Sequence, residues 1–339
     1  MRALVIGATG FIGPHVVRLL VEQGHEVAVL HRGETDADLP ENVRHIRGNR
    51  DRLGDLRREF RRLAPDVVCD AILYTEQQAR LMIEVLRGVA GRVVAISSAD
   101  VYRNFDGFRG RATAPPDPVP LAEDAPLRET RFPYRGHQLA FEHAHDYDKI
   151  LVEQVLLNQP DLPVAVLRLP AVYGPGDKQR RLAPYVGRMK DGRPAILLAK
   201  EQEDWRWTRG FVGNIAAAVA VAITDARSAG RVFNVGEEPA PAEREWVERI
   251  GAAVGWEGRI VAAPVAELPN HLRQPFHWRY DLCMDTAYIR KELGFVEPLP
   301  SAEALRRAVD WELSQYDGSH RVDYAAEDAF LESRRSDAV

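Results

Sequence analysis

Cysteine is scarce in this chain: only Cys69 and Cys283 occur among its 339 residues. Two cysteines so far apart do not make a disulfide framework, so we expect reduced thiols. Apolar runs are short, and none reaches the roughly 18 residues that a membrane helix needs. The net charge is also small, at −5, which does not favour a nucleic-acid surface. The first strand is expected to begin at Arg2 with no signal peptide before it, so the chain is predicted to be cytoplasmic.

A glycine motif with an unusual spacing stands near the start of the chain. Gly7, Gly10 and Gly13 follow the short apolar run Ala3–Ile6, and a run with helical periodicity comes next. A strand, a tight glycine turn and a helix bind a pyrophosphate, because the helix N-terminus presents free N–H groups. The commoner pattern is G-x-G-x-x-G, but this context still predicts dinucleotide binding. The predicted contacts in the turn are Gly7, Thr9, Gly10, Phe11, Ile12 and Gly13.

No acidic residue stands at the tip of the second expected strand, Glu26–His31. In dinucleotide folds an Asp or Glu there binds the 2′-hydroxyl of NAD. Arg32 takes this place, about 20 residues past the glycine turn, and a guanidinium suits the 2′-phosphate of NADP. The alternative is that Arg32 is solvated and that Glu34 or Asp36 reaches the ribose. NADP is therefore the expected cofactor, and NAD is the alternative.

Strands and helices alternate over the first half of the chain. This alternation predicts an α/β fold with a Rossmann-type, doubly wound parallel sheet. Right-handed crossovers bring the strand C-termini to one edge, where ligands gather. Asn49, Arg50 and Ala71 follow or end strands at that edge and are predicted cofactor contacts. The expected strands lie at 43–47, 66–71, 92–97 and 163–169, with helices at 52–63 and 76–88.

The pattern changes after residue 172. We expect a dinucleotide-binding domain over 1–172 and a smaller α/β substrate lobe over 173–317, of which some segments return to the first domain. Residues 318–339 are expected to form a loosely held polar tail. The proline-rich stretch 103–136 is expected to be a lid, a binding loop or a mobile segment, because structureless loops of that length are uncommon in compact domains.

Seven short motifs run through nearly the whole chain. They are Gly7–Gly13, Ser97–Tyr102, Lys149 with Glu153, Arg168–Pro175, Arg209–Val212, Val232–Gly236 and Glu292–Phe295. In this order they resemble the extended short-chain dehydrogenase/reductase family, which includes nucleotide-sugar epimerases and dehydratases. The stretches His31–Gly33 and Tyr147–Lys149 look closer to an atypical branch that includes proteins similar to the chloroplast stem-loop RNA-binding proteins. A non-catalytic cofactor-sensing or RNA-binding role is therefore one alternative to an enzyme.

The resemblance implies roles for three catalytic candidates. Ser98 matches the hydroxyl residue that hydrogen-bonds the reacting oxygen of the substrate. Lys149 matches the lysine that holds the nicotinamide ribose and lowers the pKa of a tyrosine. Asp100 stands where sugar dehydratases place an acidic residue that helps to eliminate water, and a purely structural role is the alternative.

Other positions are matched to cofactor and substrate contacts. Arg209 resembles an arginine that approaches the phosphates of a sugar nucleotide. Arg180 and Arg279 are further substrate candidates, because arginines near aromatic rings can grip a phosphate and stack a base or sugar. The matches to the loop beside the nicotinamide are Pro170, Ala171 and Val172.

The family's tyrosine is missing from its usual position. The pattern is Tyr-x-x-x-Lys, since residues at i and i+4 share one helix face and the ammonium then stabilises a phenolate. His145 stands four residues before Lys149, and Tyr147 stands only two before it, in a helix expected from about Leu139 or later to Asn158. Tyr147 reaches the site if the helix begins just after it, whereas His145 has an unperturbed pKa of about 6.5 that suits proton transfer. Tyr147 is preferred, His145 is second, and loss of the usual chemistry is third.

The expected reaction is hydride transfer at a hydroxyl or keto carbon of a sugar or nucleotide-sugar. An NADP-dependent reductase of a small carbonyl compound is the alternative enzyme. No metal site is expected from His137, His143 and His145, because 143 and 145 face opposite sides of a helix and no ligand set is complete. Nucleic-acid and membrane partners are not expected. The resemblance implies a homodimer through a helix pair on the dinucleotide domain.

Overall fold

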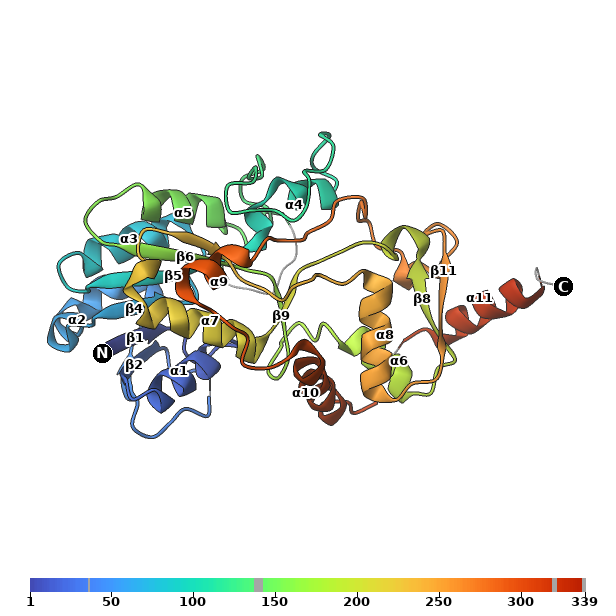
Figure 1. Cartoon of the computed structure of the whole chain (residues 1–339), viewed down its shortest axis with the longest axis horizontal. Coiled ribbons are helices and arrows are strands. Elements are labelled where there is room, and N and C mark those ends of the chain that lie inside the picture. Colours follow the sequence, from blue (N-terminus) through green and yellow to red (C-terminus); the bar gives the residue numbers. More distant parts are fainter. Residues whose placement is uncertain (36, 137–142, 319–321, 337–339) are drawn as a thin grey trace.

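One parallel sheet organises the larger part of the molecule (Figure 1). The structure is a computed structural model that describes residues 1–35, 37–136, 143–318 and 322–336. Seven strands pair in the order β10-β6-β5-β4-β1-β2-β3, all parallel. This confirms the predicted doubly wound α/β fold. The strands are β1 Arg2–Ile6, β2 Glu26–His31, β3 Arg44–Arg47, β4 Val67–Asp70, β5 Arg92–Ser98, β6 Val164–Leu169 and β10 Val232–Asn234.

The central strands are continuous apolar runs because helices cover both faces of the sheet. On one face α1 (Gly13–Glu22) packs beside α7 (Val212–Thr224), whose many alanines let it lie close to its neighbours. On the other face α3 (Glu76–Leu86) packs beside α5 (Lys149–Leu157). Each face carries its own apolar core. The sheet edge at the strand C-termini stays uncovered by these helices, so it is the place for a site.

Three segments from beyond residue 172 return to the body around this sheet. β10 pairs with β6 in the register Phe233↔Leu167, and α7 covers the face that α1 also covers. The helix α9 (Ala287–Leu293) packs against β10. The body around the sheet therefore includes parts of the chain that are far apart in sequence.

The smaller lobe lies at the right of Figure 1. Its helices α6, α8 and α10 pack together beside a two-stranded parallel sheet of β8 and β11. A second parallel pair, β7 with β9, lies between the lobe and the body. The bounds are β7 Ala171–Tyr173, β8 Ala195–Ala199, β9 Arg209–Phe211, β11 Arg259–Ala263, α6 Ala183–Lys190, α8 Glu243–Val254 and α10 Ser301–Ser314.

The remaining helices are short. Among the described residues, no helix has the length and apolar character that crossing a membrane requires. The bounds are α2 Arg57–Leu63, α4 Arg103–Phe108 and the 3-10 turns η1 Arg50–Leu56, η2 Ala99–Val101, η3 Lys200–Gln202, η4 Ala226–Ser228 and η5 Asn270–Leu272.

The polar C-terminal stretch is held more firmly than its composition suggests. A helix, α11 (Tyr324–Ser336), forms in place of the expected loose tail. Glu327 on this helix is buried, and its carboxylate lies 2.6 Å from Nη2 of Arg188 on α6 and 3.0 Å from Nε2 of His271. A buried carboxylate is tolerated only when such partners are fixed around it. Over 324–336 the tail is therefore docked onto the lobe.

Candidate functional site

The glycine turn joins β1 to α1 at the C-terminal edge of the sheet. Gly7 has a backbone φ of +84°, which residues with a side chain rarely adopt. A Cβ at Gly13 would lie 2.4 Å from the carbonyl oxygen of Gly7, so glycine is required where the helix meets the strand. A Cβ at Gly10 would meet only that same oxygen, at 3.4 Å, an ordinary contact. Gly10 is exposed at the rim of the turn, and its missing side chain leaves space there for a ligand.

The N-terminus of α1 offers unpaired N–H groups to that space. Its N-cap, Ile12, makes no side-chain hydrogen bond, and Pro14 removes only an N–H that has no helical partner. An uncapped helix start attracts an anion such as a pyrophosphate. The loop after β7 lies close by, since His15 is hydrogen-bonded to the backbone of Pro175. The predicted contacts Thr9, Phe11 and Ile12 are half-buried around this cradle, which fits a dinucleotide.

The residues expected to contact the adenosine end lie on the same edge but differ in their surroundings. Arg32 follows β2, is 45% exposed at its side chain, and pairs with Glu34 at 3.0 Å. Asn49 uses its side chain to cap η1, accepting the N–H of Asp51 at 2.8 Å. Asp36, an alternative ribose contact, lies outside the described residues.

Arg50 is buried rather than lying on the surface. Its Nη2 lies 2.8 Å from Oδ2 of Asp70, at the end of β4, and donates to the carbonyl of Gln78 at 3.1 Å. Its Nε and Nη1 are buried and have no hydrogen-bond partner among the described residues. Ala71 lies directly beside Gly7, under the glycine turn. Arg50 therefore has donors left over for a ligand at this edge.

A buried carboxylate is the centre of the polar group at the end of β5. Asp100 is 5% exposed, and its Oδ2 accepts hydrogen bonds from the hydroxyls of Tyr147 at 2.8 Å and Tyr134 at 3.0 Å. Its Oδ1 is buried without a partner among the described residues. Burial raises the pKa of Asp100, while Arg128 and the two phenols oppose the rise. Ser98 ends the strand, and its Oγ accepts the N–H of Asp100 at 3.2 Å.

Tyr147 enters this group because α5 begins later than a helical spacing argument assumes. The helix starts at Lys149 with Asp148 as its N-cap, so Tyr147 precedes the helix and the angle of 100° per residue does not set its direction. Its hydroxyl is hydrogen-bonded to Ser98 as well as to Asp100. Burial and the charge of Asp100 raise the pKa of Tyr147 well above its usual value, so the phenol is neutral near pH 7. Leu139, the earliest expected helix start, lies outside the described residues.

Lys149 links two strand ends beneath this group. Its Nζ donates to the carbonyls of Leu73 at 2.8 Å and Ile96 at 2.7 Å, and lies 5.8 Å from the ring centre of Tyr147. Burial lowers the pKa of Lys149 to about 8, although the charge of Asp100 acts to raise it. The ammonium is therefore held at a fixed place beside Ser98, Asp100 and Tyr147.

The structure does not bring His145 into this group. Its side chain is 71% exposed, and Nδ1 lies 2.9 Å from Oδ1 of Asp146. The reason is that the Tyr-x-x-x-Lys spacing applies within a helix, and 143–146 form a turn before it. His137 lies outside the described residues. Among the residues that are described, no three His, Cys, Asp or Glu side chains gather as metal ligands.

Two members of the polar group were missed by sequence reasoning, and both come from the stretch 103–136. Tyr134 binds Asp100 directly, and Arg128 forms an ion pair with Asp148 at 2.9 Å in which both side chains are fully buried. Asp148 also accepts the N–H of Phe132 at 2.9 Å. The only signal was the expectation that this stretch is a binding loop, because neither residue belongs to a motif.

The predicted substrate arginines lie in three separate places. Arg209 is buried in an ion pair with Glu243, Arg180 pairs with Glu312 of α10, and Arg279 donates to the hydroxyl of Tyr280 at 2.9 Å. The structure does not gather them into one site, and each already has a partner. The loop positions Pro170, Ala171 and Val172 lie between β6 and β7, next to the same sheet edge.

Comparison with known proteins agrees with this architecture. Residues 3–236 match the NAD dependent epimerase/dehydratase family. A 2′-dehydrokanamycin reductase of Streptomyces kanamyceticus is 27% identical over 78% of this chain and 70% of its own length. A dTDP-glucose 4,6-dehydratase of Streptomyces niveus is 25% identical over 92% of both chains. The crystal structure of a Thermus thermophilus UDP-glucose 4-epimerase with NAD has a TM-score of 0.66 at 21% identity, covering 93% of this chain and all of the other.

The cradle predicts how two glycine substitutions will differ. Gly10→Ala should lower dinucleotide affinity about tenfold, or roughly 1.4 kcal/mol, because the new methyl group occupies ligand space. Its melting temperature should not change, since the Cβ meets only an ordinary contact. Gly54→Ala is the matched control, because a Cβ there has no neighbour within 4 Å. Fluorescence titration with NADH and NADPH measures the dinucleotide affinity of the wild-type protein and of both variants. Equal affinity in all three proteins would refute a dinucleotide site at this glycine turn.

Proposed function

The chain belongs to the NAD dependent epimerase/dehydratase family, and we propose on that basis that it transfers a hydride at a hydroxyl or keto carbon of a sugar or nucleotide-sugar. The observation that carries this proposal is the group of Ser98, Asp100, Tyr147 and Lys149 at the same sheet edge as the glycine cradle. The family is one of NAD-dependent enzymes. Two of the three proteins compared above are named for nucleotide-sugars, which supports the substrate class.

Three residues of the group, Ser98, Tyr147 and Lys149, have distinct tasks in this reaction. When bound, the nicotinamide supplies or takes up the hydride. Ser98 orients the reacting oxygen, since its Oγ lies beside the hydroxyl of Tyr147. Tyr147 moves the proton of that oxygen, and the ammonium of Lys149 holds positive charge near it. The missing tyrosine at 145 is thereby replaced by one that stands just before the helix.

Two substitutions separate the candidate acid/base residues. Tyr147→Phe should reduce turnover by at least about 100-fold, because general acid/base catalysis is worth that much. His145→Ala should leave turnover within about twofold, since His145 faces solvent. Turnover is measured on UDP-glucose and dTDP-glucose, with dinucleotide titration as a check on folding. The reverse pattern would assign the proton transfer to His145.

A reductase that uses NADP is the second candidate, and Arg32 is the observation that favours it. Its partner Glu34 is well exposed, and exposed ion pairs contribute little. A half-exposed guanidinium at this place suits the 2′-phosphate of NADP. NAD is the alternative cofactor, and it is the dinucleotide bound in the Thermus structure.

Cofactor choice is tested by removing this guanidinium. Arg32→Ala should weaken NADPH binding about tenfold, roughly 1.4 kcal/mol, and change NADH binding much less, because only NADPH carries the extra phosphate. Arg58→Ala, on the outer face of α2, is the control for loss of one surface charge. Wild-type protein that binds NADH more tightly than NADPH would make NAD the cofactor.

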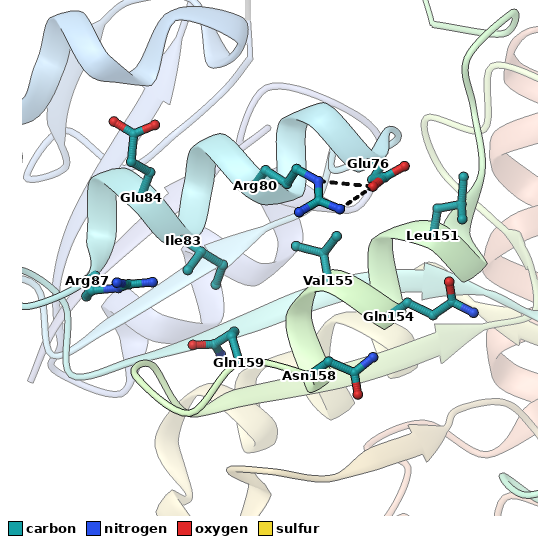
Figure 2. Close-up of a pocket in the computed structure, with 10 residues that line it drawn as sticks. All are labelled: Glu76, Arg80, Ile83, Glu84, Arg87, Leu151, Gln154, Val155, Asn158 and Gln159. Carbon is teal, nitrogen blue, oxygen red and sulfur yellow. Dashed lines mark hydrogen bonds and ion pairs between the residues drawn. The ribbon is translucent and has the colours of Figure 1, made fainter.

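We also propose that the protein forms a homodimer through α3 and α5. Figure 2 shows a pocket between these helices that is lined by Ile83 of α3 and by Leu151 and Val155 of α5, with charged side chains along α3. These charges alternate in sign along α3, from Glu76 and Arg80 to Glu84 and Arg87. The same helix of a second copy, running antiparallel, places opposite charges against each other and covers the three apolar side chains of the pocket.

A charge in the pocket should therefore separate the two copies. Val155→Asp should change the mass measured by light scattering from twice 38.0 kDa to that of one chain, because the carboxylate loses its water in the interface. Val296→Asp is the control, since Val296 is 77% exposed elsewhere on the surface. A monomeric wild-type protein would contradict the proposed dimer.

Location in the cytoplasm is part of the same proposal. Both cysteines are buried free thiols, and a reducing compartment keeps such thiols free.

A further inference from the structure

Tyr134 makes a contact that the proposed chemistry does not use. It lies at the end of the stretch 103–136, and its hydroxyl donates to the same oxygen of Asp100 that accepts from Tyr147. The centres of the two rings lie 5.0 Å apart. A stretch with little regular structure thus delivers a second phenol to the catalytic group.

The carboxylate between the two phenols is arranged asymmetrically. Its Oδ2 accepts two hydrogen bonds, while Oδ1 is buried with none among the described residues. An ionised carboxylate without partners on one oxygen is costly in such a place, whereas a protonated carboxyl group leaves that oxygen uncharged. The geometry therefore suits a group that takes up and releases a proton.

The charged and titratable groups around Asp100 come from two segments of the chain. The 103–136 stretch contributes Arg128, whose Nε donates to the backbone carbonyl of Asp100 at 2.9 Å. The start of α5 contributes Tyr147 and Lys149. Arg109 and Arg111, just beyond α4, act on Tyr134 rather than on Asp100 itself. The two phenols are the donors that touch the carboxylate directly.

We propose that Asp100 is the proton reserve behind Tyr147, and that Tyr134 is the positioning residue that sets the pH at which this reserve is filled. The inference rests on the proposed function, because it names how the proton moved by Tyr147 is replaced. It adds to that function a residue outside the family's motifs. It also gives the 103–136 stretch a chemical task beyond covering the site.

Reduction of a carbonyl group to an alcohol consumes one hydride and one proton. A hydride from the reduced nicotinamide dinucleotide reaches the carbonyl carbon, and the carbonyl oxygen takes the phenolic proton of Tyr147. The O–H bond of Tyr147 breaks, and its oxygen takes the proton of the protonated Asp100 carboxyl group. Asp100 is left as the carboxylate and regains a proton from water. Oxidation of an alcohol runs the same transfers backwards, so it needs Asp100 ionised.

The effect of Tyr134 on this reserve has a definite sign. Burial raises the pKa of Asp100, and a hydrogen bond from a phenol favours the carboxylate and lowers that pKa. Removing the Tyr134 hydroxyl should therefore move the protonation midpoint of Asp100 to higher pH. A shift of about one pH unit corresponds to one hydrogen bond to a charged group.

The midpoint is measured by carbon NMR on the full chain labelled with 13C at aspartate carboxyl groups, and the signal of Asp100 is identified by its absence in Asp100→Asn. Tyr134→Phe should raise the midpoint by about one pH unit, as should Tyr147→Phe. Tyr288→Phe is the control, since it removes a phenol near β10 that has no contact with Asp100. If Tyr134→Phe unfolds, 3-fluorotyrosine at position 134 serves instead. It is a stronger donor of nearly the same size and should lower the midpoint.

The proposal is overturned if the protonation midpoint of Asp100 moves no further with Tyr134→Phe, or with 3-fluorotyrosine at position 134, than it does with the control Tyr288→Phe. Carbonyl reduction should also lose rate as pH rises through the Asp100 midpoint, and Tyr134→Phe should move this loss to higher pH. Absence of turnover on every sugar tested would count against the proposed function, while the NMR midpoints would still decide the coupling of Tyr134 to Asp100. If the protonation midpoint of Asp100 shifts and the pH dependence of carbonyl reduction does not shift with it, the role of Asp100 as proton reserve is overturned.

Discussion

The buried ion pair between Arg128 and Asp148 is the constraint on which the polar group of Ser98, Asp100, Tyr147 and Lys149 depends. Neither side chain is exposed, so each charge is stabilised only by the other and by nearby hydrogen bonds. Asp148 at the same time caps α5 and holds the backbone of Phe132. One carboxylate thus fixes where α5 begins and where the 103–136 stretch ends. Breaking such a pair typically costs about 3–5 kcal/mol, which explains why the two segments keep one arrangement.

A second buried network ties the same stretch to the sheet. Arg168 on β6 binds Glu153 of α5 and the carbonyl of Glu123, while Glu153 accepts the hydroxyl of Ser97 at 2.5 Å. Asn234 on β10 donates to the carbonyl of Leu121 at 2.9 Å. These contacts surround the ends of β5, β6 and β10. They place Ser98, Asp100, Tyr147 and Lys149 with little freedom, which is what proton transfer over hydrogen-bond distances requires.

Local sequence patterns were enough to predict the glycine turn and the parallel sheet. The spacing of Gly7, Gly10 and Gly13 predicts a tight turn, because backbone sterics act within a few residues. The alternation of strand and helix patterns predicts the parallel sheet, because each of these patterns also lies within a short segment. The polar composition of residues 318–339 predicts a loosely held tail, whereas Glu327 within it is buried. This burial depends on Arg188, which lies far away in sequence. Tyr134 had no local signature either, because its partner Asp100 is 34 residues away.

The sequence by itself determined the fold class, the place of the glycine turn between β1 and α1, and the family to which the motifs point. Only the tertiary structure decided that Tyr147 meets Asp100 while His145 faces solvent. The physical reason is that the direction of a side chain just outside a helix is set by the capping carboxylate and the segments packed against it. Long-range ion pairs fix that start of the helix, and no spacing within one segment encodes them. The phenol that meets Asp100 is therefore placed by packing rather than by the motif.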